Sequence, residues 1–193
     1  MKKTFLLSCC LLAAIVVKAQ YGPRLFLDIP NMSFSVPDVT KPTQRMGFDL
    51  GTAFNVGTHW SVARVGGGAV FSLSPDADDL AESFQINPFL VAEVGAGIYR
   101  SNGNKCARTQ QNAFTAIAKA GVRYTFYSKD EKALLDESGQ IDYSIGGEFG
   151  NFFIRDVFKN YEVFISPNYY LKSKVLAGNI GFKLFLNLRA DRD

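Results

Sequence analysis

The chain has 193 residues, and its 21 lysine and arginine residues against 18 aspartate and glutamate residues give a formal net charge of +3. That excess lies entirely in Lys2, Lys3 and Lys18, so residues 20–193 are formally neutral. Net charge therefore gives no argument for binding to nucleic acid or to an acidic surface, and the length favours a single domain.

The first 19 residues have the pattern of a secretory signal peptide. Two lysines precede an apolar run over residues 5–17, and Val17-Lys18-Ala19 resembles a small-residue cleavage site. A membrane-spanning helix needs about 20 apolar residues, so we expect a cleaved signal over 1–19 in preference to an uncleaved anchor. No later segment reaches that length, which leaves strands as the only way for residues 20–193 to lie in a membrane.

Beyond the leader, apolar and polar residues alternate with a period of two, which predicts extended strands with one apolar and one polar face. In the clearest segment every even position from Phe114 to Phe126 is apolar, while the odd positions include Lys119 and Arg123. The predicted strands, in chain order, are 24–28, 47–57, 60–73, 90–99, 113–127, 141–150, 161–171 and 179–188. Together with the secretory signal, strands of this kind predict a small barrel in an outer membrane, apolar outside and polar inside.

Three of these strands are less regular than the others. The third contains Gly66–Gly68, where we expect a bulge that resets the alternation, with Arg64 kept on the polar face. The seventh contains Pro167, which in a closed barrel needs a bulge or a rim position. The first is included because single-chain bacterial outer-membrane barrels have an even number of strands.

The connections are expected to be short on the periplasmic side and long on the outside. A tight turn at 56–58 fits the periplasmic side. Two connections fit this scheme poorly, because 101–112 is long for a periplasmic turn and 172–174 is short for an external loop. The long polar connections assigned to the outside are 30–44, 74–82 and 128–140.

These segments resemble the small OmpA/OmpX-type outer-membrane β-barrels, and more particularly the outer-membrane β-barrel domain proteins of Bacteroidota. The resemblance rests on the leader ending in Ala19-Gln20 and on the strands GFDLGTAFNVGTHW, AEVGAGIYR, AGVRYTFY and GNIGFKLFLNL. It implies an all-β fold, an antiparallel up-and-down transmembrane β-barrel of eight strands over residues 20–193. It also implies a location in the cell outer membrane, without implying an activity.

The C-terminus departs from that family. Many such barrels end on an aromatic residue that the outer-membrane assembly machinery reads, whereas this chain ends in RADRD. The corresponding signal is therefore expected further from the end, at Phe185 or Leu188.

Six charged residues on the polar faces are the candidate functional residues. The interior of an eight-stranded barrel is just wide enough for side chains to fill, and unpaired charge away from water is costly. We therefore expect a structural network inside the barrel, with a narrow pore for ions or small solutes as the alternative. The six residues are Asp49, Glu93, Lys119, Arg123, Glu148 and Lys183.

The sequence contains no catalytic or cofactor motif. His59 is the only histidine, which excludes a two-histidine metal site, and no spacing indicates a Ser-His-acid arrangement with a serine such as Ser61. No phosphate-binding loop, dinucleotide fingerprint or cysteine-histidine cluster is present. We expect no enzymatic activity, no cofactor and no nucleic-acid partner. The expected partners are outer-membrane lipid, the assembly machinery and an unidentified protein at the external loops.

Alternation alone does not say which face is inside. A soluble secreted lipocalin-like barrel that binds an apolar ligand would turn the apolar face inward. Polar faces rich in glycine with isolated charges instead favour a tight polar lumen. The sequence thus predicts a non-enzymatic outer-membrane barrel with a structural or surface-interaction role, and the soluble barrel is kept as an alternative.

Overall fold

The structure is a computed structural model of the chain. The predicted signal peptide lies outside the residues that it describes. These are 23–36, 46–73, 84–99, 108–109, 112–126, 141–153, 161–186 and 189–190.

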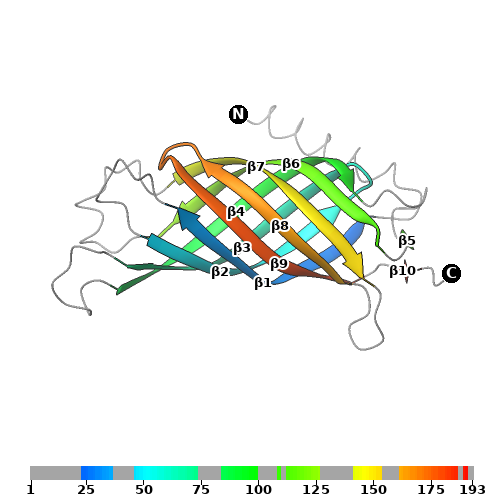
Figure 1. The fold of residues 1–193 in the computed structure, drawn as a ribbon, viewed down its shortest axis with the longest axis horizontal. Helices are drawn as coiled ribbons and strands as arrows, with labels where there is room; N and C mark the ends of the chain where they lie inside the picture. The colour runs from blue at the N-terminus through cyan, green and yellow to red at the C-terminus, as the bar shows by residue number, and fades with distance from the viewer. Residues whose placement is uncertain are drawn as a thin grey trace, which may run out of the picture.

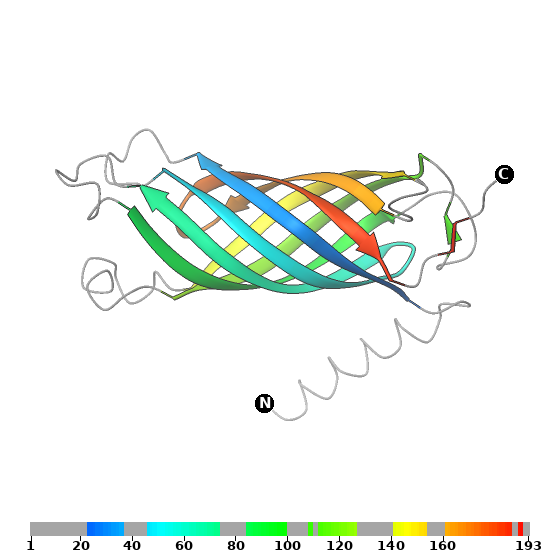
Figure 2. The same cartoon turned by 90° about the horizontal axis from the view of Figure 1, so that it is seen from below.

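Eight antiparallel strands close into a barrel, in which each strand pairs with its neighbours in the order β1-β2-β3-β4-β6-β7-β8-β9 and β9 pairs with β1 (Figure 1). The turned view in Figure 2 shows the same inclined strands around the other side. The predicted all-β, eight-stranded antiparallel barrel is therefore confirmed. The strands are β1 (Arg24–Val36), β2 (Met46–Gly57), β3 (Ser61–Leu73), β4 (Phe84–Tyr99), β6 (Phe114–Thr125), β7 (Ile141–Phe153), β8 (Tyr161–Tyr170) and β9 (Val175–Phe185).

A second, very small sheet lies beside one end of the barrel (Figure 1). It consists of β5 (Arg108–Thr109) and β10 (Arg189–Ala190), which pair in parallel. This pairing, which the alternation does not predict, joins Arg108–Thr109 between β4 and β6 to Arg189–Ala190 near the C-terminus.

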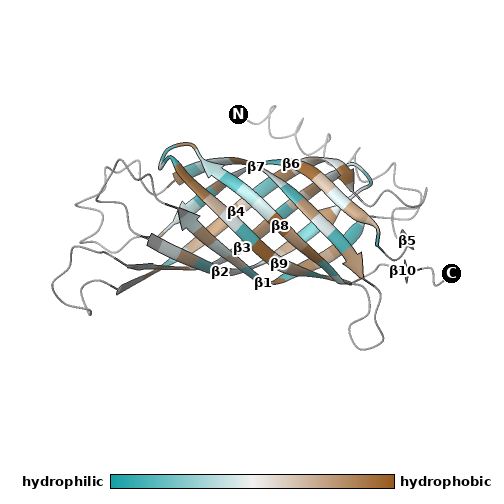
Figure 3. Cartoon of the chain, viewed as in Figure 1, coloured by the Kyte–Doolittle hydropathy of each residue, from teal (hydrophilic) through white to brown (hydrophobic). Residues whose placement is uncertain are grey.

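Along each strand the residues alternate between the lumen and the outside, as the period of two requires. On β6, Thr115, Ile117 and Lys119 are buried in the lumen, whereas Ala118 and Ala120 are exposed on the outer surface. Figure 3 shows the alternation of hydrophobic and hydrophilic residues along the strands.

β1 is longer than predicted: residues 30–36 of the segment assigned to an external loop are strand, while 37–44 lie outside the described residues. The register shifts between Asp28 and Asn31 against both neighbouring strands, so Ile29 and Pro30 form a bulge. Proline lacks an N–H donor, and a bulge allows it to lie in a closed barrel without breaking a ladder hydrogen bond. The bulge also changes which residues face inward: Asp28 is buried before it and Ser33 after it. The alternation predicts only residues 24–28 as strand because the bulge interrupts it.

The bulge expected at Gly66–Gly68 is wrong, because β3 pairs in unbroken register with both β2 and β4 there. A Cβ atom on Gly66 would lie 2.5 Å from the carbonyl oxygen of Thr52 and 2.6 Å from the Cβ of Ala53. The glycine thus allows β2 and β3 to approach closely. Pro167 lies opposite Gly178 of β9 without the expected bulge, and the β7–β8 pairing is interrupted beside it, between Gly146–Asn168 and Phe149–Ile165.

Two short connections mark the two ends of the barrel. At the β2–β3 end, the backbone N–H of Thr58 donates to the carbonyl of Ser61 at 2.8 Å, so the turn lies slightly later than predicted. At the opposite, β8–β9 end, the Asp142 carboxylate accepts hydrogen bonds from the backbone N–H groups of Lys172 (2.9 Å) and Ser173 (3.1 Å). A side chain of β7 therefore holds this turn, which is short for an external loop.

Candidate functional site: the charged lumen

The barrel has the opposite distribution of polar and apolar side chains to that of a water-soluble domain. Large apolar side chains cover the outside, with Val65 65% exposed, Val94 60% and Leu186 57%. The soluble lipocalin-like alternative needs the apolar faces inside, and the described wall has them outside. The buried charged residues of the lumen are Arg24, Asp28, Asp49, Arg64, Glu93, Lys119, Glu148, Glu162 and Lys183.

Glu148 on β7 is the first of two hubs in the lumen. Its Oε2 atom accepts a hydrogen bond from Arg64 Nη2 at 2.7 Å and lies 3.2 Å from Lys119 Nζ. Its Oε1 atom pairs with Lys183 Nζ, which also lies 3.0 Å from Glu162 Oε1. One carboxylate from β7 thus joins side chains of β3, β6 and β9 across the interior.

Arg64 on β3 is the second hub. Its guanidinium lies 2.8 Å from Glu93 Oε2 and 3.1 Å from Asp28 Oδ2, in addition to its contact with Glu148. Its Nε atom also donates to Asn55 Oδ1 at 2.7 Å. Arginine suits this position because its planar group offers several donors in fixed directions. We call the seven linked ionic residues the central network: Asp28, Arg64, Glu93, Lys119, Glu148, Glu162 and Lys183.

Asp49 and Arg123 form a second ion pair, nearer the β8–β9 end. Arg123 Nη1 lies 2.5 Å from Asp49 Oδ2 and 3.3 Å from the hydroxyl of Tyr170. The guanidinium also lies over the ring of Phe89, 4.2 Å from its centre, in a favourable cation–π arrangement. The structure therefore places four of the six predicted residues in the central network and the other two in this pair.

Sequence reasoning left three members of the central network unassigned: Asp28, Arg64 and Glu162. The alternation predicts that Arg64 lies on the polar face but does not assign it to the network. Asp28 and Glu162 belong to the less regular strands. Each of these two residues nevertheless has an apolar residue on either side of it in the sequence. That alternation was the signal that identifies them as residues of the lumen.

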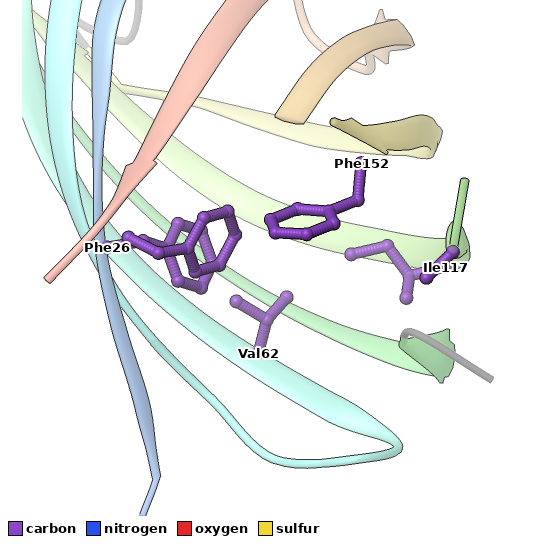
Figure 4. Close-up of a cluster of buried hydrophobic side chains, with 6 residues drawn as sticks. Phe26, Val62, Ile117 and Phe152 are labelled. Atoms are coloured by element: carbon purple, nitrogen blue, oxygen red, sulfur yellow. The ribbon is translucent and has the colours of Figure 1, made fainter. Parts of the chain in front are cut away.

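The β2–β3 end of the lumen holds an apolar cluster, which the alternation did not predict (Figure 4). The ring of Phe185 lies 4.9 Å from that of Phe26 and 5.9 Å from that of Phe152, between centres. Phe185 thus points into the lumen and packs there, while Leu188, the other suggested assembly signal, lies outside the described residues. The apolar cluster consists of Phe26, Val62, Ala113, Ile117, Phe152 and Phe185.

The only histidine lies in the turn between β2 and β3. His59 Nδ1 is 3.4 Å from Arg24 Nη2, and the hydroxyl of Ser61 is 2.8 Å from that of Thr58. The described residues contain no group of three or more side chains arranged to hold a metal ion. In the same part of the chain, no helix is long and apolar enough to cross a membrane.

Comparisons with protein-family models, curated proteins and solved structures returned no match. The resemblance to small outer-membrane barrels therefore stays a prediction. Function has to be inferred from the wall and the lumen of this barrel.

Proposed function

We propose that this chain is a non-enzymatic outer-membrane β-barrel protein with a structural or surface-interaction role. Its wall would be the anchor in the bilayer, its polar lumen would stabilise that wall, and its external loops would contact surroundings or partners. The observation that carries this proposal is the apolar outer surface around a lumen of buried ion pairs.

The outer surface supports the bilayer as its environment. Among the described residues, 26 large apolar side chains are exposed. Fully burying one such side chain is worth about 1.5–3 kcal/mol, and monomeric soluble proteins rarely expose apolar patches larger than a few hundred Å². A closed ring of strands also pairs its backbone groups internally, which is the condition for crossing a bilayer with strands.

The contents of the lumen favour a structural role over a narrow pore. The apolar cluster lies at the β2–β3 end, and the central network follows it along the barrel axis. Removing one partner from a buried ion pair is strongly destabilising, because the other charge is then left unpaired. We therefore assign Asp49, Glu93, Lys119, Arg123, Glu148 and Lys183 to bracing the wall from inside.

Cell fractionation combined with gel mobility tests this function. The full chain, expressed with its leader in a Gram-negative host, should remain in the outer-membrane fraction after washing. On a denaturing gel its band should change mobility between unheated and boiled samples, as a folded barrel does. A soluble protein whose band is indifferent to heating would contradict the proposal.

Arginine substitutions on the wall test which surface meets lipid. Ala118→Arg, near the middle of β6, and Leu184→Arg, near the end of β9, should both impair membrane assembly. Arginine on the lipid face costs about 2–4 kcal/mol at the midplane and less near the interfaces, so Ala118→Arg should have the larger effect. Ser173→Arg, in the exposed turn between β8 and β9, is the matched control and should assemble normally. Normal assembly of both wall variants would show that water, not lipid, covers this surface.

A further inference from the structure

Three buried side-chain oxygens belong to residues that face the lumen at the β1–β9 pairing. They are Asn31 Oδ1, Ser33 Oγ and Asn179 Oδ1, and none has a hydrogen-bond partner among the described residues. Ser33 is only 5% exposed. A buried oxygen without a donor costs about 1–3 kcal/mol, so three at one place call for a ligand.

The strand register brings the three residues close to one another. Ser33 on β1 pairs directly with Asn179 on β9, and Asn31 follows the same face of β1 two residues earlier. Directly opposed residues in an antiparallel pair have Cβ atoms about 4.5–5.5 Å apart. The bulge at Ile29 and Pro30 is what turns Asn31 and Ser33 toward the lumen.

The described neighbours of these residues donate no hydrogen bond to the three oxygens. Asn31 pairs with glycines on both sides, Gly51 of β2 and Gly181 of β9, which carry no side chain. Ser33 has Asp49 as its other neighbour, an acceptor whose Oδ2 atom already pairs with Arg123.

On the far side of Asn179, Ser166 of β8 is its register partner. The hydroxyl of Ser166 accepts a hydrogen bond from Asn168 Nδ2 at 3.3 Å. Ser33 and Ser166 therefore flank the same asparagine, but only Ser166 has a partner of its own.

We propose that these three oxygens form a binding site for one buried water molecule at the β1–β9 pairing. Buried waters typically make about three hydrogen bonds to polar groups that lack other partners. The water donates to the two amide oxygens and accepts from the hydroxyl of Ser33, which satisfies all three groups at once. The site holds the first and last barrel strands together, and it does not depend on where the barrel is located.

The substitution Ser33→Ala distinguishes an occupied site from an empty one, because it should lower the urea midpoint only when the site is occupied. With water bound, Ser33→Ala removes a hydrogen bond and lowers the urea midpoint of the folded full-length barrel. With nothing bound, the same substitution deletes a buried hydroxyl that has no partner, so the midpoint stays unchanged or rises. A rise or no change overturns the proposal.

A double-mutant cycle with Asn179→Ala supplies the second measurement. If one water joins the two residues, the double variant loses less than the sum of the two single losses. Ser166→Ala is the matched control: Ser166 is also a direct neighbour of Asn179 but has Asn168 as its own partner, so its coupling to Asn179→Ala should be smaller than that of Ser33→Ala. Additive losses for the Ser33 cycle overturn the proposal.

A crystal structure of the unaltered protein distinguishes water from an ion. We expect one water within hydrogen-bond distance of all three oxygens. The urea midpoint should also be the same in sodium chloride and in choline chloride of equal ionic strength. A midpoint that depends on sodium in the unaltered protein but not in Ser33→Ala identifies a cation and overturns the proposal, as does a crystal structure without density at the site.

Discussion

The two ends of the lumen are filled in different ways. Toward the β2–β3 end, the apolar cluster and the central network fill the interior with large side chains. Toward the β8–β9 end, most buried side chains apart from Phe89 are polar and uncharged, and one ion pair, Asp49–Arg123, crosses between β2 and β6. Side-chain contacts across the lumen thus stabilise the barrel mainly toward one end, and substitutions at the two ends should have unequal effects on stability.

Glu148→Gln should have the largest effect, because it removes one charge that Arg64, Lys119 and Lys183 share. Breaking a fully buried ionic network by removing one partner costs about 3–5 kcal/mol. We expect a correspondingly lower free energy of unfolding, measured by urea unfolding in detergent micelles or lipid vesicles.

Asp49→Asn is the matched control at the other end. Its side chain is 11% exposed, and its ion pair involves a single cation, so we expect a smaller loss than for Glu148→Gln, about 1.5–3 kcal/mol. If Glu148→Gln and Asp49→Asn lowered the free energy of unfolding equally, the contacts at the two ends would stabilise the barrel equally, which would contradict this comparison.

The difference between the ends was only partly predictable from the sequence. Clean alternation placed Glu93, Lys119 and Glu148 in the lumen, because a period of two fixes the side of the wall on which each residue lies. It does not fix the distances across the lumen, which depend on how far each strand is shifted along its neighbour. The division of six charged residues into a network and a separate pair therefore needed the structure.

Two features were hidden from sequence reasoning for separate physical reasons. The bulge at Ile29 and Pro30 reverses the alternation within β1, so the second half of that strand looked like a loop. Phe152 and Phe185 are apolar residues inside a lumen that the alternation describes as polar. Apolar side chains on an inward face look like irregularities until their partners across the barrel are known.

Phe152→Leu should have an intermediate effect on stability. Phe152 is fully buried in the apolar cluster, where its ring contacts that of Phe185. Leucine leaves part of that volume empty, and we expect a loss of about 1–2 kcal/mol in the free energy of unfolding. The measurement is again urea unfolding.

Phe149→Leu is the control on the same strand, because Phe149 is 53% exposed on the outer surface. A lipid-facing side chain has no fixed cavity around it, so this variant should differ little from the unaltered protein. A larger loss for Phe149→Leu than for Phe152→Leu would contradict the assignment of the core to the lumen.

Thr52→Val should have the smallest effect, and it probes the surroundings of the wall. Thr52 is the one polar residue that interrupts the apolar face of β2, and its hydroxyl donates to the carbonyl of Asp28 at 2.8 Å, beside the bulge. Valine has a similar shape but lacks the donor. In lipid no water replaces the lost hydrogen bond, so we expect a loss of about 1 kcal/mol. In water the carbonyl is hydrated instead, and the urea midpoint should not change. An unchanged midpoint in vesicles would therefore count against a lipid-covered wall at β2, even if the barrel itself is folded.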